Sequence, residues 1–262
     1  MLSQSIIVAR KEIVDHLRDL RSVISSLMYA LMGPVVVFLV ALTLRTQPRS
    51  GSTAEVLAGM MSVFTLVAAF VGGMNVAMDT IAGERERRSL LPLLLNPVLR
   101  HDIMIGKWLS IAVFSVGGLI LNLLGFGVVF TTGGIRLTGD APALLLALAL
   151  GLLPLSLLAA ALQLLISTLC RSTKESQTYL SMVVFAPMLI GMFLVFYPGA
   201  PPGWFRILPI AGQQLQLELL MRGGELPIFQ PLWLGSLTTA AALLILFLAA
   251  DRLDRDEIVY GN

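Results

Sequence analysis

Six long uncharged stretches, separated by short charged or proline-rich connections, dominate the hydrophobic pattern of the chain. Each is long enough to cross a bilayer as a helix, because a crossing takes about 20 predominantly apolar residues. The pattern therefore predicts an all-α integral membrane protein with six transmembrane helices. The expected spans are residues 24–44, 56–78, 108–131, 141–169, 177–197 and 230–250.

Composition agrees with this fold class, since 56% of the residues are hydrophobic, against about 45–50% in soluble domains. The formal charge of +2 is small and scattered, which excludes a nucleic-acid partner. The only cysteine, Cys170, excludes an internal disulfide. With no internal repeat and no room for a soluble domain, we expect one membrane domain over residues 1–262. No cleavable signal peptide is visible, so the mature chain is expected to begin near Met1.

The distribution of Lys and Arg predicts the orientation. Thirteen lie in the N-terminal segment, the second and fourth connections and the C-terminal tail, and five lie in the connections of the other side. Because positive charge in short loops stays on the cytoplasmic side, both termini are expected to face the cytoplasm.

The N-terminal segment has the pattern of an amphipathic helix. Its apolar residues recur at steps of three or four and form one stripe: Leu2, Ile6, Ala9, Ile13, Leu17, Leu20 and Ile24. Arg10, Lys11 and Asp15 lie mostly off that stripe, which is typical of a helix in the membrane interface. Such a helix either anchors the chain or forms a ledge that contacts a partner, and the pattern does not separate the two.

The connection between the second and third spans, residues 79–107, holds the densest charges of the chain. Residues 79–89 carry charges of both signs, and Leu90–Leu95 then form an apolar patch. Exposed leucines reduce solubility unless something covers them, so this connection is interpreted as a docking surface. The alternative is positive-inside anchoring, with the leucines on the lipid interface.

The same residues carry a family resemblance. GERER after the second span, the leucine run, the NP pair and GK before the third span resemble the permeases of type 2 ABC transporters. The opening ARKEIVDHLRD, residues 9–19, is similar to the entry helix of that family, and most similar to Nat-type sodium-exporter permeases. The chain departs from the family pattern at Arg88 and Ser89, where Gly and Thr are common, and at Pro92.

The resemblance implies an elbow helix at residues 4–22, a cytoplasmic coupling helix between spans two and three, and a dimer of permease copies in a bacterial or archaeal cell membrane. It also implies export driven by a separate ATP-binding subunit, which would hold ATP and magnesium. The residues that would couple this chain to the ATPase are Glu84, Arg85, Glu86, Arg87, Arg88, Leu90 and Leu91. Charges suit a polar cleft, and the leucines could be buried against it.

The chain itself is expected to have no ATPase chemistry, no cofactor and no metal site. Gly106 and Lys107 are followed by Trp108, so the phosphate-loop pattern fails. His16 and His101 have no companions at metal-ligand spacing. The alternative to an exporter subunit is a stand-alone secondary transporter or a membrane scaffold without an ATPase partner.

Few polar residues lie near or within the expected spans. Asn75, Asp79, Asn122 and Gln163 either line a transport path or form interhelical hydrogen bonds, and membrane lipids surround the remainder. Residues 198–229 form the largest segment of the outer side, with a short helix expected at 211–222 that is either a lid or a gate. The cargo stays open among ions, lipids, peptides and drugs.

Overall fold

The protein is a bundle of long helices in a computed structural model, which describes residues 2–44, 51–89, 98–133, 141–197, 199, 201–221, 224, 226–227 and 229–253. Within these ranges the regular structure is entirely helical. Six helical segments are long and apolar enough to cross a membrane, so the predicted fold class is confirmed. These segments are Leu20–Thr43, Val56–Glu86, Arg100–Val129, Leu150–Leu169, Thr173–Phe196 and Phe229–Arg252.

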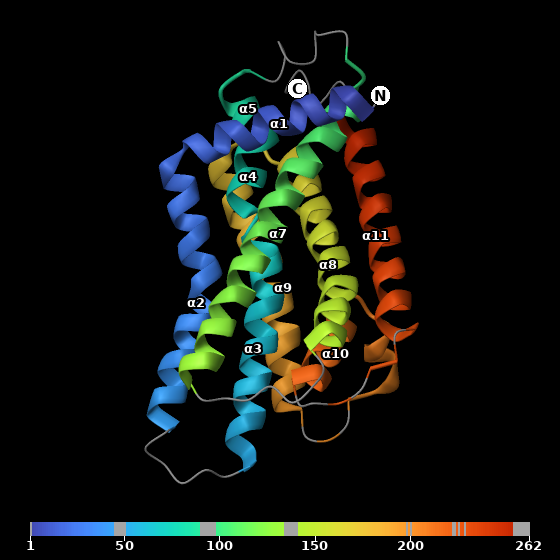
Figure 1. Cartoon of the computed structure of the whole chain (residues 1–262). Helices are drawn as coiled ribbons and strands as arrows, with labels where there is room; N and C mark the ends of the chain where they lie inside the picture. The colour runs from blue at the N-terminus through green and yellow to red at the C-terminus, as the bar shows by residue number, and fades with distance from the viewer. Residues whose placement is uncertain are drawn as a thin grey trace.

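The helices follow one another with short connections (Figure 1). They are α1 (Leu2–Arg18), α2 (Leu20–Leu44), α3 (Gly51–Val71), α4 (Met74–Met78), the π-helix η1 (Asp79–Gly83), α5 (Glu84–Glu86), α7 (Arg100–Gly133), α8 (Ala141–Leu169), α9 (Thr173–Phe196), the 3₁₀ helix η2 (Gly203–Arg206), α10 (Ala211–Met221) and α11 (Phe229–Leu253). The second span thus consists of α3, α4, η1 and α5 in succession.

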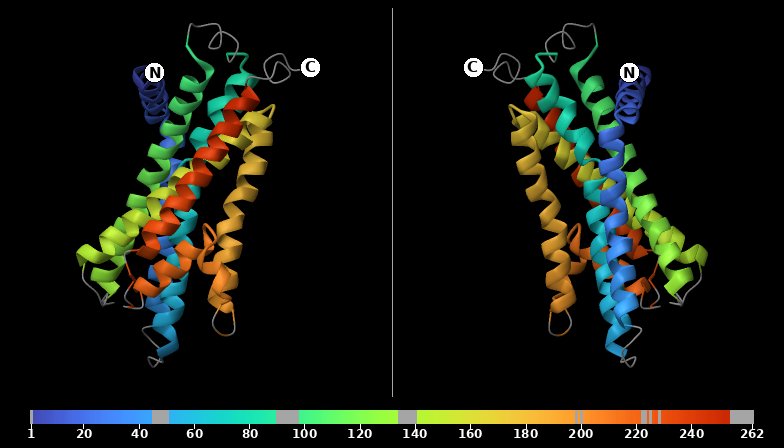
Figure 2. Two further views of the ribbon diagram at one scale, coloured as in Figure 1. Left: turned by 90° about the vertical axis from the view of Figure 1, so that its right-hand side faces the viewer. Right: turned by 90° about the vertical axis from the view of Figure 1, so that its left-hand side faces the viewer.

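The second and fourth spans form the centre of the bundle, because most of their residues are buried while a third or less of each other span is buried. Leu66 and Phe70 of α3 pack there with Leu155 and Ala159 of α8 and Ala242 of α11. Figure 2 shows α9 standing at the side of the bundle. Lipid chains are as apolar as leucine, so the exposed apolar faces of the outer spans are what a bilayer requires.

The second span is interrupted where it crosses the third. Its helix breaks at Gly72 and Gly73, between α3 and α4. A Cβ atom on Gly72 would lie 2.7 Å from the carbonyl oxygen of Phe114, and one on Gly73 would lie 2.8 Å from the carbonyl oxygen of Ile111. The two backbones therefore approach more closely than any residue with a side chain would allow.

Helical structure is present at both ends of the predicted coupling segment, residues 79–107. Helical structure continues through η1 and α5 to Glu86, and α7 begins at Arg100. The charged residues at the end of this buried helix remain helical because partners in the fold satisfy them. Leu90 and Leu91 lie outside the described residues.

α1 lies across one end of the bundle, roughly perpendicular to the spans (Figures 1 and 2). Asp19 forms the corner between α1 and α2. Its carboxylate accepts hydrogen bonds from the Ser22 hydroxyl (2.6 Å) and the Arg21 amide (3.2 Å), as an N-cap residue does. We call this the α1 end; η2 and α10 lie at the opposite end.

The helix expected at residues 211–222 is present as α10, Ala211–Met221. Ile210 precedes it with a positive φ of 71°, which is unfavourable for a β-branched residue. The side-chain oxygen of Gln213 accepts a hydrogen bond from the Ile210 amide at 2.5 Å. Gln213 is the third helical residue, so this bond is one half of a capping box, and it holds the start of α10 in place.

Candidate functional site: the charged cluster at the α1 end

A buried lysine joins three segments at the α1 end. The ammonium nitrogen of Lys107, on α7, lies 2.9 Å from the carboxylate of Glu84, 3.3 Å from that of Glu12, and 2.8 Å from the carbonyl oxygen of Thr80. Lys107 is completely buried. An ammonium group has three donors, and three acceptors surround it here. We call Glu12, Thr80, Glu84 and Lys107 the lysine node.

α1 reaches the lysine node through one buried face, on which the polar residues Ser5, Glu12 and His16 lie beside Ala9 of the apolar stripe. Ser5, Glu12 and His16 are buried, whereas Ile6 and Leu17 of the apolar stripe are exposed by 57% and 56%. These two residues of the stripe therefore point away from the protein, as an interfacial helix would present them to lipid, whereas Ala9 of the same stripe packs inward. The interfacial location itself remains a prediction.

Close packing of α1 on α7 supports the same arrangement. A Cβ atom on Gly106 would lie 2.7 Å from the carbonyl oxygen of Ser5, so a larger residue would push α1 away. The Ser5 hydroxyl donates to Asp102 of α7 at 3.1 Å. Glu12 is consequently held within reach of Lys107.

The π-helix η1 shapes the second side of the node. A π-helical turn contains one residue more than an α-helical turn, and such turns are frequent at functional sites. The Thr80 carbonyl of η1 accepts from Lys107, and the amide of Ala82 donates to the Ser167 hydroxyl of α8 at 3.2 Å. η1 is thus bonded to both the third and the fourth span.

Arg85 and Glu86 bond to the turn between α8 and α9. The guanidinium of Arg85 donates to the carbonyls of Cys170 (2.7 Å) and Thr168 (3.1 Å), which belong to the end of α8. The carboxylate of Glu86 accepts from the Thr173 amide at 2.8 Å and from its hydroxyl at 2.6 Å. A cation at a helix C-terminus and an anion at a helix N-terminus both complement the helix dipoles. These two residues fasten the second span to α8 and α9.

Arg87 pairs with Asp79, about two helical turns back along the same segment. The guanidinium lies 2.8 Å from the Asp79 carboxylate, and this hydrogen bond raises the pKa of Arg87 above its ordinary value. Both side chains are partly exposed, at 57% and 38%. The pair therefore closes the outer surface of the cluster and contributes little stability of its own.

Arg88 ends the helix in a left-handed conformation, with φ of 56°. The amide of Ser89 donates to the Glu84 carbonyl at 2.8 Å and that of Arg88 to the Arg85 carbonyl at 3.0 Å. This is the Schellman arrangement, in which the left-handed position favours glycine. The departure from the family pattern at Arg88 is therefore a substitution at the helix stop, and the stop is retained.

The predicted coupling residues thus fall into two groups. Glu84 is buried, and Arg85 and Glu86 are bonded within the chain. Arg87, which pairs with Asp79, and Arg88 are exposed, and so is the side chain of Glu86. Sequence reasoning did not identify Glu12 and Lys107 as members of the site. A charge adjoining a long apolar run, as at Lys107, was the signal that could have found them.

The four polar residues considered for a path make different contacts. Asn75 donates to the Ser25 hydroxyl of α2 at 2.8 Å, and Asn122 of α7 donates to the Ala30 carbonyl of α2 at 2.9 Å. Gln163 of α8 donates to the carbonyl of Phe70 in α3. These three bonds join neighbouring helices, which is the alternative to path lining.

A polar cavity of about 210 Å³ adjoins the lysine node. Glu12, Asp15, His16, Asp79 and Arg87 are among the residues that line it. Burial lowers the pKa of His16 below its ordinary value of 6.5, although the charges of Asp79 and Glu12 oppose this shift. In the part of the chain that the structure describes, no group of three or more His, Cys, Asp or Glu residues is placed to hold a metal ion.

The six spans, the helix across their end and the charged cluster together define a multi-pass membrane protein. Its second span is bonded to α2, α7, α8 and α9, and Lys107 of α7 links it to α1. A model of ABC-2 family transporter proteins matches residues 6–221, and the chain therefore belongs to that family. The resemblance to type 2 ABC transporter permeases is confirmed.

The chain is also similar in sequence to two proteins described as ABC transporter permeases. The chain is 35% identical to the ABC transporter permease protein NatB of Bacillus subtilis (strain 168) over 158 residues, which cover 56% of this chain and 39% of the relative. It is 32% identical to the probable ABC transporter permease protein NosY of Pseudomonas aeruginosa over 123 residues, which cover 46% of this chain and 42% of the relative. The matches thus span about two fifths of the length of each relative.

Proposed function

We propose that the chain is the permease subunit of an ATP-driven exporter, which works as a dimer of permease copies with separate ATP-binding subunits. The observation that supports this most is the bonding of the GERER segment. Glu84 joins it to Lys107 and Glu12, while Arg85 and Glu86 join it to the turn between α8 and α9. A force applied at this one segment would therefore move several spans together.

The site for the ATPase contact, in this proposal, begins at the exposed residues Arg87, Arg88 and Ser89 and continues toward Leu90 and Leu91. Closure of two ATPase subunits around ATP would push on that surface as a rigid body. Glu84, Arg85 and Glu86 transmit the push within the permease, and they do not touch the ATPase. This division refines the set of seven coupling residues by giving its members two different tasks.

The break at Gly72 and Gly73 supplies a place where the transmitted force could bend the second span. The segment from Met74 to Glu86 is bonded at the α1 end through η1 and α5, whereas α3 lies beyond the break. A rigid segment that ends at a helix interruption can rotate about it. The proposal places the α1 end in the cytoplasm, where ATP is available.

A co-purification experiment tests the proposal. The tagged chain is expressed with the ATP-binding subunit that a neighbouring gene should encode, solubilised gently, and assayed for retained partner and for ATP hydrolysis in liposomes with magnesium. We expect the wild-type complex to remain intact and Arg88→Glu to release the ATPase, because a charge is reversed on the contact surface. Arg88→Gly is the matched control for backbone effects, since glycine favours the left-handed conformation of the helix stop.

The result that would contradict the proposal is a chain that transports without retaining any ATP-binding protein and is unaffected by Arg88→Glu. That outcome would favour a secondary transporter. Orientation is tested separately in a Cys170→Ser background, with single cysteines at Ser89 and Trp204 and a membrane-impermeant maleimide applied to intact cells. We expect label at Trp204→Cys and none at Ser89→Cys.

A further inference from the structure

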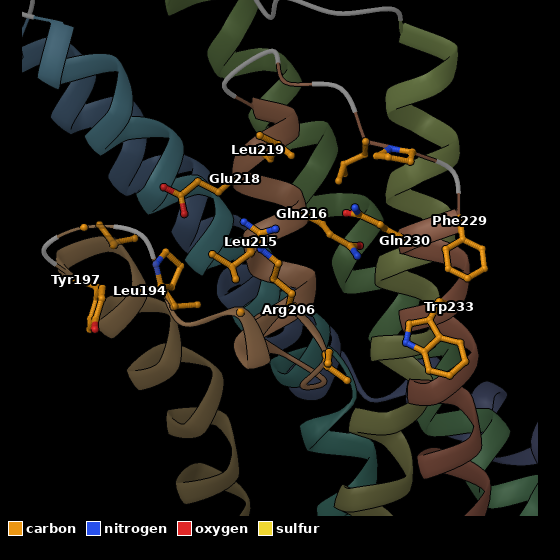
Figure 3. Close-up of a pocket in the computed structure, with 18 residues that line it drawn as sticks. Leu194, Tyr197, Arg206, Leu215, Gln216, Glu218, Leu219, Phe229, Gln230 and Trp233 are labelled. Atoms are coloured by element: carbon orange, nitrogen blue, oxygen red, sulfur yellow. The ribbon is translucent and has the colours of Figure 1, made fainter.

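A second cavity, of about 830 Å³, lies at the opposite end of the bundle between α9, η2, α10 and α11 (Figure 3). Its volume falls within the range of about 300–1,000 Å³ that is usual for small-molecule sites. It is about four times larger than the cavity beside the lysine node. The proposed coupling residues lie at the other end, so this cavity has no part in coupling.

α10 forms a fixed wall of the cavity. On its inner side, Gln213 donates to the Thr238 hydroxyl of α11 at 2.7 Å, and Gln214 donates to the Gly191 carbonyl of α9 at 3.0 Å. Its other side, with Gly212, Gln216 and Leu219 at helical spacing, lines the cavity. The helix is therefore bonded through one face and leaves the other available to a ligand.

Three polar side chains of this cavity have hydrogen-bond donors that no other described residue accepts. Arg206, Gln216 and Gln230 line it, and none of the three makes a side-chain hydrogen bond or ion pair with another residue in the described ranges. Figure 3 shows Gln216 and Gln230 extending from α10 and α11 into the space between these helices. Glu218 also lines the cavity but has an interaction of its own. Arg206 is thus the positive charge that a ligand could neutralise, and guanidinium groups match phosphate and carboxylate.

The rim of the cavity is apolar and outward-facing. Phe229 is 72% exposed, Trp233 54% and Ile207 55%, and all three line the cavity. Aromatic residues gather at the level of lipid headgroups, where one end of the ring is apolar and the other is wet. A ligand that met both the rim and Arg206 would need a hydrocarbon part beside an anionic part.

We propose that this cavity binds the anionic head of an amphiphile, with a phosphate or carboxylate at Arg206 and amide hydrogen bonds from Gln216 and Gln230. The hydrocarbon chain leaves past Phe229 and Trp233 into the membrane. Binding needs no ATPase, so this inference and the proposed function fail or succeed separately.

Quenching of Trp233 fluorescence by brominated lipids tests the proposal. Trp108→Phe and Trp204→Phe leave Trp233 as the single tryptophan, and the protein is placed in phosphatidylcholine vesicles that contain brominated phosphatidylglycerol or brominated phosphatidylcholine. We expect the anionic lipid to quench more strongly. Arg206→Gln should weaken its binding about tenfold, the loss that one charge-assisted hydrogen bond implies.

Two controls sharpen the test. Arg206→Lys should keep the preference for anionic lipid because it keeps the charge, and Arg171→Gln, an exposed arginine at the α1 end, should not change it. Native mass spectrometry of the unaltered chain with the same two lipids provides a second measurement that does not depend on the tryptophan variants.

Three outcomes would overturn the inference. The first is equal quenching by both lipids, and the second is a preference that persists in Arg206→Gln. The third is retention of inorganic phosphate alone by the cavity, with no displacement by the anionic lipid, which would identify a free anion as the occupant.

Discussion

The two ends of the bundle are held together by different chemistry. At the α1 end, charged groups bond to one another and to helix ends, as Lys107 does with Glu12 and Glu84. At the opposite end, the neutral amides of Gln213 and Gln214 hold α10. The α1 end encloses a cavity of about 210 Å³ and the opposite end one of about 830 Å³.

The difference shows how buried charge constrains packing. A charge removed from water must be surrounded by partners with good geometry, so the segments that supply those partners are brought into fixed positions. A neutral amide costs less to leave partly unpaired than a charge does, so its helix can leave one face open. We therefore expect the α1 end to move as one unit and the opposite end to accommodate a ligand.

The largest expected effect is on the lysine node. Lys107→Met should lower the free energy of unfolding by about 3–5 kcal/mol, because it leaves the carboxylates of Glu12 and Glu84 buried without their cation. Denaturant unfolding in detergent micelles measures the loss. Lys11→Met is the control: Lys11 is 58% exposed, so its loss should stay below about 1 kcal/mol. If Lys107→Met and Lys11→Met lowered the free energy of unfolding equally, the lysine node would not stabilise the fold.

The next effect is at the turn between α8 and α9. Arg85→Ala should cost about 1.5–3 kcal/mol, because two carbonyls at the end of α8 lose a charged donor. Arg87→Ala, at the exposed pair with Asp79, should cost at most about 1 kcal/mol. Thermal unfolding, followed by size-exclusion chromatography, compares the stability of the Arg85→Ala and Arg87→Ala variants. If Arg87→Ala were the more damaging change, the second span would not be fastened through Arg85.

At the opposite end, loss of one side-chain amide should lower the free energy of unfolding less than loss of one buried charge does. Gln213→Ala is expected to cost about 1–2 kcal/mol, because both the Thr238 hydroxyl and the Ile210 amide lose their partner. Gln216→Ala, on the cavity face of α10, should leave the free energy of unfolding unchanged. A loss from Gln216→Ala as large as that from Gln213→Ala would show that the cavity face is not free.

The smallest expected effect is a dependence of stability on pH through His16. Burial lowers the pKa of folded His16 below 6.5, so the unfolded chain binds this proton at higher pH than the folded chain. Stability should therefore be complete above pH 6.5 and decrease as the pH falls through that value and below it. Unfolding followed at several pH values, with His16→Gln as the reference, isolates the contribution. A stability curve of the same shape in both proteins would exclude His16 as its source.

Much of the fold could be predicted because each transmembrane span has its own signal. The apolar stretches are long enough to be recognised individually, and a helix in lipid must satisfy its backbone within itself. The short helix α10 was also predicted, from residues 211–222. The bonding of Asp79–Glu86 was not, because its partners in α7, α8 and α9 are distant in the sequence.

The charges of the candidate site illustrate the same limit. Arg85 and Arg88 are three residues apart and have the same charge, yet one caps a helix inside the bundle and the other is exposed at a helix stop. The resemblance identified the segment that carries them. It could not assign their tasks, because the carbonyls that receive Arg85 are more than 80 residues away along the chain.

Apolar runs and short motifs were enough to predict a six-span membrane protein of the type 2 ABC permease kind, with its densest charges after the second span. That information is local, since it depends on the length of apolar runs and on short motifs. Three features became visible only in the folded chain: Lys107 is buried between Glu12 and Glu84, His16 of α1 faces inward, and Arg206 lines a cavity. Each of these depends on which helices are neighbours, and neighbouring helices bring together residues that no local pattern connects.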